Sequence, residues 1–448
     1  MPTLWFERAL LPDGWVRRVR ISVAGAFISA VETDVAPQPD DQRHGAALPG
    51  LCNVHSHGFQ RGMAGLSERR GRPDDDFWSW RAVMYRFLDR LTPDDIAAIT
   101  AQAYVEMLES GFTRVGEFHY LHNDVSGARY ADPAETAGAI VAAAEASGIG
   151  LTLLPVFYAH ADFGGAPPAP GQRRFISNVD GFARLVEASR AKLPADAVLG
   201  IAPHSLRAVT LDELEAIIPL AESGPIHIHA SEQIREVEAC LRWSSARPVE
   251  LLLDHGEIDA RWCLIHSTHV DERERAQLAA SGAVAGLCPV TEANLGDGVF
   301  PAVEYLAAGG RIGVGTDSNI LIDAASELRA IEYSQRLTRR KRALLVDDAE
   351  PSVGAKLFAS AHAGGAQALG IKSGIAVDNA ADLVALDLDH PAMIGAGADL
   401  LDRWIFAARP GAIDGVWRAG RKLVDHGRHI AADAIAARYR HTVAALLA

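Results

Sequence analysis

The sequence predicts an α/β fold, a (β/α)8 TIM-like barrel with a small β-rich domain built from both chain termini. Three observations support this prediction. Short β-rich segments alternate with amphipathic helical segments from residue 49 onward, polar side chains gather where those β-rich segments end, and strand-like alternation appears near both ends of the chain. Strand–helix alternation repeated eight times is typical of this barrel, in which catalytic groups lie at the carboxyl ends of the strands.

The barrel strands are predicted from eight β-rich segments. In chain order they are "LCNVHSH" (51–57), "RVGEFHY" (114–120), "GLTLLPVFY" (150–158), "AVLGIAPHS" (197–205), "PIHIHAS" (225–231), "CLIHSTHV" (263–270), "AVAGLCP" (283–289) and "RIGVGTDS" (311–318). Helix signals separate them: Thr92-Pro93 marks a helix start, Thr210 with Glu213 has the spacing of a capping box, and Gly148 and Gly282 mark helix ends. We therefore expect the barrel to span residues 49–374.

The two flanks have a different pattern. Residues 1–48 alternate in strand fashion in "WVRRVRISVAGAFISAVE", and the segments "ADLVALD", "WIFAAR", "GVWRAGRKLV" and "GRHI" after residue 374 predict further strands. Residues 1–48 and 375–448 are therefore expected to form one small composite domain.

Composition and charge exclude several classes of protein. No apolar run approaches the roughly 20 residues needed to cross a bilayer, so no membrane partner is expected. The net charge of −14 disfavours nucleic acid, and the basic run at 336–342 predicts a solvated helix face. The four cysteines are scattered without a C-x-x-C pair, and the first residues lack the features of a secretory signal. We expect a cytoplasmic protein without disulfides.

Two histidines end the first predicted strand. His55 and His57 are two residues apart, so both rings point to the same side of a strand. A third imidazole from His229 and the carboxylate of Asp317, each ending another strand, complete three nitrogens and one oxygen, a set suited to Zn²⁺ or Fe²⁺. A lone buried histidine is more often a satisfied core residue, but four ligands at strand ends predict a metal site.

Other polar residues near this site have alternative roles. Glu232 follows His229 by three residues in "HASE", where its carboxylate can fold back beside a water on the metal. His266 continues the apolar strand in "IHSTH", so we expect it, rather than His269, in the site. His227 lies one layer deeper than His229 and is expected to be structural.

These motifs resemble the amidohydrolase superfamily, in particular its mononuclear deaminase branch. The longer segments "NVHSHGFQRGMAGL", "DDFWSWRAVMYRFLDRLTP", "VGEFHYLH", "ELRAIEYSQRL" and "AGGAQALG" resemble the N-formimidoyl-L-glutamate deiminase family, and the resemblance covers nearly the whole chain. Many relatives hold two metals bridged by a carboxylated lysine, but no predicted strand here carries a lysine. The resemblance therefore implies one divalent ion, Zn²⁺ first and Fe²⁺ second, and a hydrolase that acts on C–N bonds of linear amidines.

The reaction that the resemblance implies is deimination of N-formimidoyl-L-glutamate to N-formyl-L-glutamate and ammonia in histidine degradation. This small anionic substrate, derived from an amino acid, carries two carboxylates, which call for cationic contacts. The expected substrate-binding residues are Gln60, Arg81, Tyr120, His204 and Arg207. Arg207 and Tyr120 would clamp one carboxylate, while Arg81, in a lid segment, and Gln60 would hold the other or the imine end. Asn319 stands where this family has a histidine, and we expect it to tune the pocket.

The expected catalytic residues are Glu232, His266 and Asp317. The metal lowers the pKa of a bound water, Asp317 takes its proton, Glu232 protonates the imine nitrogen and His266 stabilises the developing charge. The nearest alternative is deamination of a nucleobase, a pterin or a related cyclic amidine by the same metal chemistry. Amide hydrolysis and a non-catalytic barrel are more distant alternatives. The family resemblance also implies a homodimer.

Overall fold

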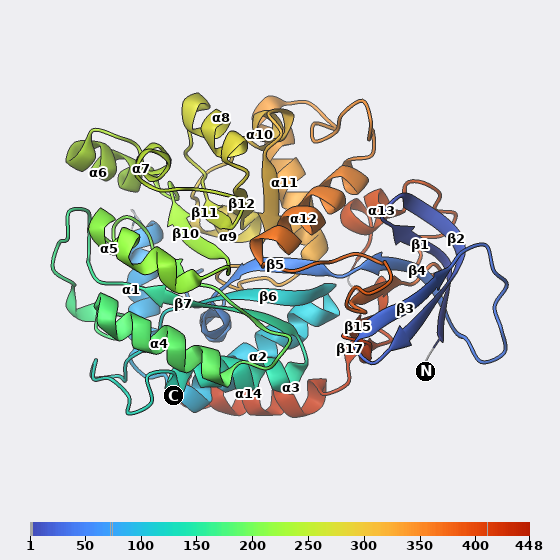
Figure 1. Ribbon diagram of the computed structural model, residues 1–448, viewed down its shortest axis with the longest axis horizontal. Helices are drawn as coiled ribbons and strands as arrows, with labels where there is room; N and C mark the ends of the chain where they lie inside the picture. The colour runs from blue at the N-terminus through green and yellow to red at the C-terminus, as the bar shows by residue number, and fades with distance from the viewer. Residues whose placement is uncertain (1–2, 72, 74, 410) are drawn as a thin grey trace.

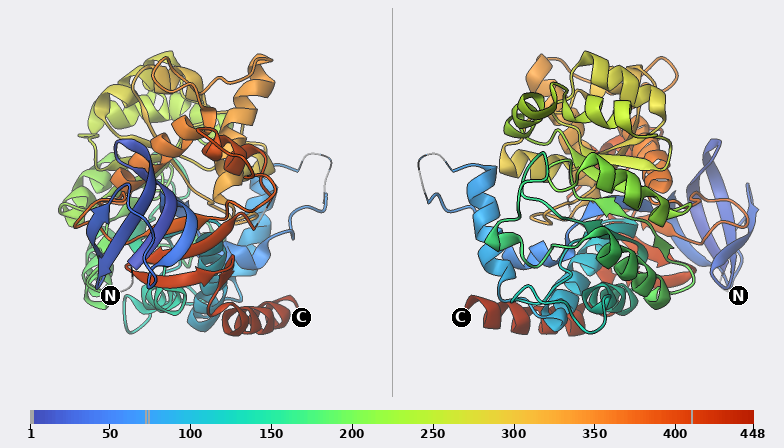
Figure 2. Two further views of the ribbon diagram at one scale, coloured as in Figure 1. Left: turned by 90° about the vertical axis from the view of Figure 1, so that its right-hand side faces the viewer. Right: turned by 60° about the vertical axis from the view of Figure 1, so that its left-hand side comes forward.

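The computed structural model describes residues 3–71, 73, 75–409 and 411–448. Two sheets organise the chain, a closed parallel barrel and a second sheet made from both ends of the chain (Figure 1). The second sheet lies at one end of the molecule, and helix α1 (Phe77–Leu88) lies at the other end (Figures 1 and 2). The predicted fold class is confirmed.

The barrel contains the eight segments predicted from sequence. They are β5 (Leu51–Ser56), β6 (Phe112–His119), β7 (Gly150–Phe157), the broken pair β8 (Val198–Leu199) and β9 (Ala202–Pro203), β10 (Ile226–Ala230), β11 (Trp262–His266), β12 (Val284–Leu287) and β13 (Arg311–Val314). Parallel pairing runs from β10 through β13 to β5 and on to β8. Three backbone hydrogen bonds of 3.0–3.1 Å between residues 201–204 and 225–229 then close the ring.

Helices cover the outside of the barrel. They are α2 (Pro93–Glu109), α3 (Glu135–Ser147), α4 (Val179–Lys192), α5 (Leu211–Ile217), α6 (Ile234–Ser244), α7 (Pro248–His255), α8 (Glu272–Ser281), α9 (Pro289–Leu295), α10 (Ala302–Ala307), α11 (Ala324–Arg339) and α12 (Val353–Ala368), with the 3-10 turns η1 (Gly58–Met63), η2 (Pro170–Gln172) and η3 (Ile218–Ala221). Thr92 and Thr210 cap α2 and α5 as expected, each with a capping box. Gly148 and Gly282 end α3 and α8 with positive φ, as a left-handed C-cap requires.

Helix α12 crosses close to the barrel strands. A Cβ on Gly364 would lie 2.0 Å from the carbonyl oxygen of Ile312, so only glycine allows this approach. At the end of α12, the carbonyl oxygen of Ala368 lies 2.7 Å from Nε2 of His227. His227 thus packs at the base of the barrel, as its structural interpretation predicted.

Helix α1 is inserted between the first barrel strand and the first barrel helix. Asp76 caps its start by accepting hydrogen bonds from the backbone N–H groups of Trp78 and Ser79. Phe77, Met84, Phe87 and Leu88 are buried on the inner face of the helix. The tryptophan-rich segment expected as a lid is therefore a helix that packs on the barrel.

The second sheet combines the two ends of the chain. Its order is β17 (Arg428–His429), β16 (Arg421–Asp425), β15 (Ile413–Arg418), β14 (Leu383–Leu386), β4 (Gln42–Pro49), β1 (Thr3–Leu11), β2 (Gly14–Ala24) and β3 (Phe27–Glu32). β4 pairs with β1 in parallel and with β14 in antiparallel fashion. Because β4 ends at Pro49 and β5 begins at Leu51, this sheet directly precedes the strand that carries His55.

Two C-terminal elements differ from the sequence expectation. "WIFAAR" was expected to be a strand, but Leu400–Phe406 form helix α13, and that prediction is wrong. Leu400, Leu401, Trp404 and Ile405 are buried with helical spacing, which the short apolar run did not distinguish from a strand. Helix α14 (Ala432–Leu447) was not foreseen either; it lies beside α2 (Figure 1). The Tyr439 hydroxyl donates to the carbonyl oxygen of Arg61 in η1, and Arg438 donates to that of Asp94 in α2.

Within the part of the chain that the structure describes, no helix has the length and apolar character needed to span a bilayer.

Candidate active site

Four side chains from three barrel strands meet at the carboxyl end of the barrel. The Nε2 atoms of His55 and His229 lie 3.1 Å apart. Oδ1 of Asp317 lies 3.4 Å from Nε2 of His55 and 3.3 Å from Nε2 of His57. All four side chains are buried, with at most 8% of the side chain exposed. The structure therefore brings together the four ligands expected from sequence.

Neighbouring carbonyl groups fix two of these imidazoles. Nδ1 of His57 donates to the carbonyl oxygen of Phe118 at 2.9 Å, and Nδ1 of His229 donates to that of His204 at 2.9 Å. A proton on Nδ1 leaves a lone pair on Nε2, and the carbonyls hold each ring in place. Burial lowers the pKa of His55, His57 and His229, so the rings are neutral and able to bind a cation. Converging lone pairs and one carboxylate fit a divalent metal ion.

The backbone around this site contains left-handed residues other than glycine. Asp317 has φ +43°, His266 has φ +67° and Ser231 has φ +51°. Such residues are strained and persist where the surrounding structure holds them. Here hydrogen bonds hold Asp317: its N–H donates to the carbonyl oxygen of His55 at 3.0 Å, and His57 donates back to its carbonyl oxygen at 3.0 Å. The turn that follows β13 is thus tied to the end of β5, which brings the carboxylate to the histidines.

Glu232 and His266 lie beside the four candidate ligands and are coupled to each other. Nε2 of His266 lies 3.7 Å from Oε1 of Glu232 and 3.8 Å from Oδ2 of Asp317. Burial alone would lower the pKa of His266, but Glu232, Glu292 and Asp317 outweigh it and raise the pKa to about 10. Burial raises the pKa of Glu232 to about 7, against the opposing charges of His266 and Arg207. The site holds an imidazolium and a carboxyl group able to exchange a proton near neutral pH.

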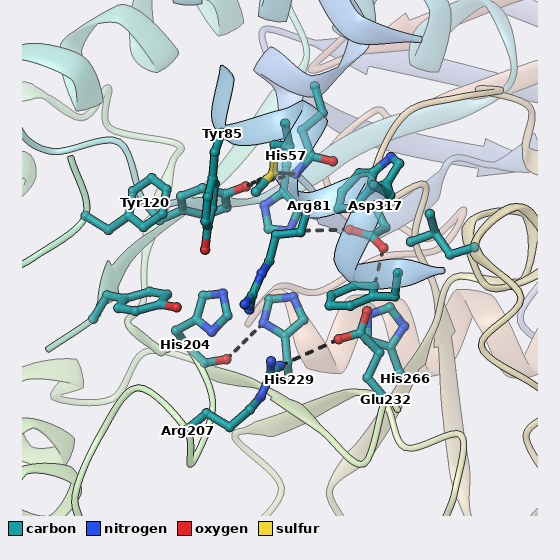
Figure 3. A pocket seen from close by; sticks show the side chains of 17 residues that line it. His57, Arg81, Tyr85, Tyr120, His204, Arg207, His229, Glu232, His266 and Asp317 are labelled. Carbon is teal, nitrogen blue, oxygen red and sulfur yellow. Dashed lines mark hydrogen bonds and ion pairs between the residues drawn. The ribbon is translucent and has the colours of Figure 1, made fainter. Parts of the chain in front are cut away.

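A cavity opens beside these groups (Figure 3). All five residues expected to bind substrate line it, together with the catalytic candidates. The lining side chains are His57, Gln60, Phe77, Trp80, Arg81, Met84, Tyr85, Tyr120, Tyr158, Phe175, His204, Arg207, His229, Glu232, His266, Leu295 and Asp317. Helix α1 supplies five of them, Phe77, Trp80, Arg81, Met84 and Tyr85, and so forms one wall of the cavity.

The polar residues of the cavity have distinct partners. Gln60 donates from Nε2 to the hydroxyl of Tyr120 at 2.9 Å. Arg207 lies 3.8 Å from Glu232 and 4.0 Å from Glu236, and its Nε has no hydrogen-bond partner. Arg81 instead lies over the ring of Trp78, 4.3 Å from its centroid. Both guanidinium groups can therefore bind an anion without breaking a short ion pair.

Some residues near the site were not foreseen. Oε1 of Glu292 lies 3.2 Å from Nδ1 of His266, and its negative charge stabilises the imidazolium. Glu292 comes four residues after Cys288 in "CPVTE", after the end of β12. That strand end carries no histidine, so the sequence held no sign of a site residue there other than this spacing. Cys288 lies near His266 and Asp317, but burial keeps its thiol pKa well above the ordinary value, so it stays protonated. Cys288 is fully buried.

Asn319 lies behind the cavity rather than in its lining. It is fully buried, and its Nδ2 lies 3.1–3.2 Å from Ser56 Oγ and from the carbonyl oxygens of His57 and Asp317. Its Oδ1 accepts a hydrogen bond of 2.6 Å from Thr316. Asn319 therefore holds the ends of two strands together and does not shape the pocket directly, contrary to expectation.

The barrel carries a polar cavity over a cluster of three imidazoles and one carboxylate. These features are typical of metal-dependent hydrolases built on a TIM barrel. The model of the amidohydrolase family matches residues 46–423, and a model described as formimidoylglutamate deiminase HutF, N-terminal domain, matches residues 1–45. The chain belongs to the amidohydrolase family.

Individual relatives agree with this assignment. A formimidoylglutamate deiminase from Pseudomonas aeruginosa is 49% identical over 434 residues, which cover 96% of each chain. The crystal structure of an amidohydrolase from Brucella melitensis is 51% identical and superposes with a TM-score of 0.97 over 100% of both chains. An adenosine deaminase from Xanthomonas campestris with bound zinc shares the fold, with a TM-score of 0.82 at 22% identity over 99% and 98% of the two chains.

Proposed function

We propose that this chain catalyses the hydrolytic deimination of N-formimidoyl-L-glutamate to N-formyl-L-glutamate and ammonia in histidine degradation. One observation carries the proposal: Arg81 and Arg207 line the same cavity as Glu232, His266 and three of the four candidate metal ligands, His57, His229 and Asp317. This substrate needs both features, a hydrolytic centre for its imine carbon and cations for its two carboxylates. The 49% identity to the Pseudomonas relative that bears this activity in its name supports the proposal.

We propose a single Zn²⁺ ion, held by Nε2 of His55, His57 and His229 and by Oδ1 of Asp317. Three imidazoles and one carboxylate also suit Fe²⁺, so the choice of zinc is part of the proposal. When bound, such an ion supplies Lewis acidity that makes water a nucleophile near pH 7.

The side chains around this centre then move protons. Oδ2 of Asp317, which faces His266, accepts the proton of the attacking water. Oε1 of Glu232 holds a proton and gives it to the imine nitrogen, which becomes an amine. The proton that Asp317 took from the water then passes to this nitrogen, and the carbon–nitrogen bond breaks to release ammonia. The remaining hydroxyl proton returns to Glu232, so both carboxyl groups end in their starting states. The imidazolium of His266 faces the oxygen that becomes the formyl oxygen and stabilises its negative charge.

The two arginines place the substrate for this reaction. Arg207 comes after β9, beside His204 at the cavity wall, and binds one carboxylate with Tyr120 as a second donor. Arg81 comes from α1 and binds the other carboxylate, with Gln60 toward the imine end. The two guanidinium groups hold the imine carbon over the four candidate ligands. Because the substrate is already positioned, the entropic cost of reaching the transition state falls.

A direct assay tests this function. Ammonia release is measured for N-formimidoyl-L-glutamate, guanine, cytosine and N-formyl-L-glutamate with the zinc-loaded protein. We expect release from the first compound only. Release from guanine or cytosine alone would overturn the proposal.

One feature favours deamination of a cyclic amidine as the second candidate. The aromatic rings of Trp80, Tyr158 and Phe175 line the cavity and could stack on a nucleobase or a pterin. Such a ring would leave the two arginines without anionic partners, which is why we rank this function second. The same assay separates the two.

The homodimer, the cytoplasmic location and the division into units 1–48 with 375–448 and 49–374 also remain proposals. Light scattering after gel filtration, cell fractionation and limited proteolysis test them in turn.

A further inference from the structure

A third arginine lies near two arginines that line the cavity, but does not line the cavity itself. Arg235 is an exposed residue in the first turn of α6. Its guanidinium carbon lies 4.6 Å from the ring centroid of Trp78 on α1. The guanidinium of Arg81 lies 4.3 Å from the same centroid, and that of Arg207 lies 5.8 Å from it. One indole therefore has three guanidinium groups around it.

In the part of the chain that the structure describes, two of the three guanidinium groups in this cluster have no carboxylate partner. Among the described residues, neither Arg81 nor Arg235 forms an ion pair with a carboxylate, and Arg207 has only contacts of 3.8 and 4.0 Å. The chain as a whole carries a net charge of −14. Three like charges this close repel one another, and cation–π contacts of about 0.5–1 kcal/mol at exposed sites do not remove that charge. A bound anion would give these charges an attractive partner.

We propose that Arg235 is a further specificity-determining residue, which recruits dianionic substrates to the mouth of the cavity. The inference rests on the proposed function, because N-formimidoyl-L-glutamate carries two carboxylates. Arg81 and Arg207 line the cavity and bind the substrate after entry, whereas Arg235 acts during the approach. All three guanidinium groups lie within 5.8 Å of the Trp78 ring centroid, and Arg235 is the exposed one of the three.

This role makes a distinct kinetic prediction. A charge at the rim changes the rate of association and its dependence on salt, and leaves the chemical step alone. One unit charge near a dianion at about 8 Å in water contributes about fivefold at low ionic strength. At 0.5 M salt the Debye length is about 4 Å, so this contribution almost disappears.

The experiment compares Arg235→Met, Arg235→Lys and the matched control Arg242→Met. Arg242 lies on the same helix, exposed, and pairs at 3.8 Å with Glu238. For N-formimidoyl-L-glutamate we expect R235M to lower kcat/KM about fivefold at low salt, with kcat unchanged and the loss vanishing at high salt. R235K should keep most of the activity, because it keeps the charge, and R242M should match the wild type. An unchanged salt dependence in R235M, or an equal loss in R235K, would overturn the proposal.

Binding measurements separate this inference from the proposed function. Calorimetry with N-formyl-L-glutamate, a dianion, and N-formyl-L-glutamine, a monoanion, needs no turnover. R235M should weaken the dianion about fivefold and the monoanion about twofold, because the attraction scales with charge. Equal weakening of both ligands, or of neither, would contradict the role of Arg235. Absence of ammonia release by the wild-type protein would instead refute the proposed function, while this comparison still decides the role of Arg235.

Discussion

Asn319 donates a hydrogen bond from Nδ2 to the carbonyl oxygen of His57, 3.1 Å away, and a second to the carbonyl oxygen of Asp317, 3.2 Å away. One fully buried amide thus joins two of the four candidate metal ligands through their backbones. Asn319 lies outside the cavity, but these hydrogen bonds fix the positions of the His57 and Asp317 backbones within it.

Asn319→Asp should weaken zinc binding by at least about tenfold, because outer contacts of this kind tune affinity by roughly 10–100-fold. The new carboxylate would face carbonyl oxygens at the distances where the amide now donates. Zinc affinity is measured by competition with a chelator. Asn178→Asp is the control, because Asn178 caps α4 through a side-chain oxygen that aspartate also has. Equal zinc affinity in both variants would contradict this role.

His229→Ala should abolish metal binding, whereas His227→Ala should not. The two residues are two apart on β10, but only His229 faces the ligand cluster, and His227 bonds to Ala368 at the base of the barrel. Elemental analysis of the purified variants measures the metal, and thermal melting measures the cost of H227A, which we expect to lower Tm. Loss of metal in H227A would refute the assignment.

Glu232→Gln should retain the metal and reduce kcat by about 10²-fold or more, since an amide cannot deliver the proton that the carboxyl group holds. Steady-state assays with metal analysis check both halves of the prediction. Glu238→Gln, an exposed residue on the same side of the barrel, serves as the control and should behave as wild type. Near-normal turnover in E232Q would remove Glu232 from the mechanism.

Arg81→Met should raise KM about 10- to 100-fold, the loss expected for a hydrogen bond between charged groups. Arg86→Met is the matched control, since Arg86 lies on the same helix, is exposed and does not line the cavity. Initial rates over a range of substrate concentrations give KM and kcat separately. An unchanged KM would mean that Arg81 does not bind the substrate.

Glu117→Gln should change how stability depends on pH. Burial raises the pKa of Glu117 from 4.5 to about 7, against hydrogen bonds from Gly58, Ser56 and Tyr104 that lower it. Between these values the folded chain keeps a proton that the unfolded chain has released, so stability falls as pH rises, by about 3 kcal/mol at most. The Tm of E117Q relative to wild type should therefore rise between pH 5 and pH 8. Parallel pH profiles would contradict the raised pKa.

The fold and the chemical identity of the site could be predicted from the sequence because both depend on local patterns. Two-residue spacing places His55 and His57 on one side of a strand, and a parallel barrel brings all strand ends to one rim, so His229 and Asp317 follow. Capping at Thr92 and Thr210 is equally local. The short segment 404–409 was predicted wrongly, because an apolar run of that length suits a buried strand or a buried helix alike.

Tertiary structure alone decided how these groups are coupled. The sequence by itself determined the barrel, the ligand types and the cations, since these depend on residue identity and spacing. It did not determine that Glu292 lies beside His266, or that Asn319 bonds to the backbone of both β5 and the turn after β13. Nor did it determine that three arginines from separate elements lie around the ring of Trp78. Those relationships join residues far apart in the chain, and their energies depend on distance and burial, which exist only after the barrel has closed.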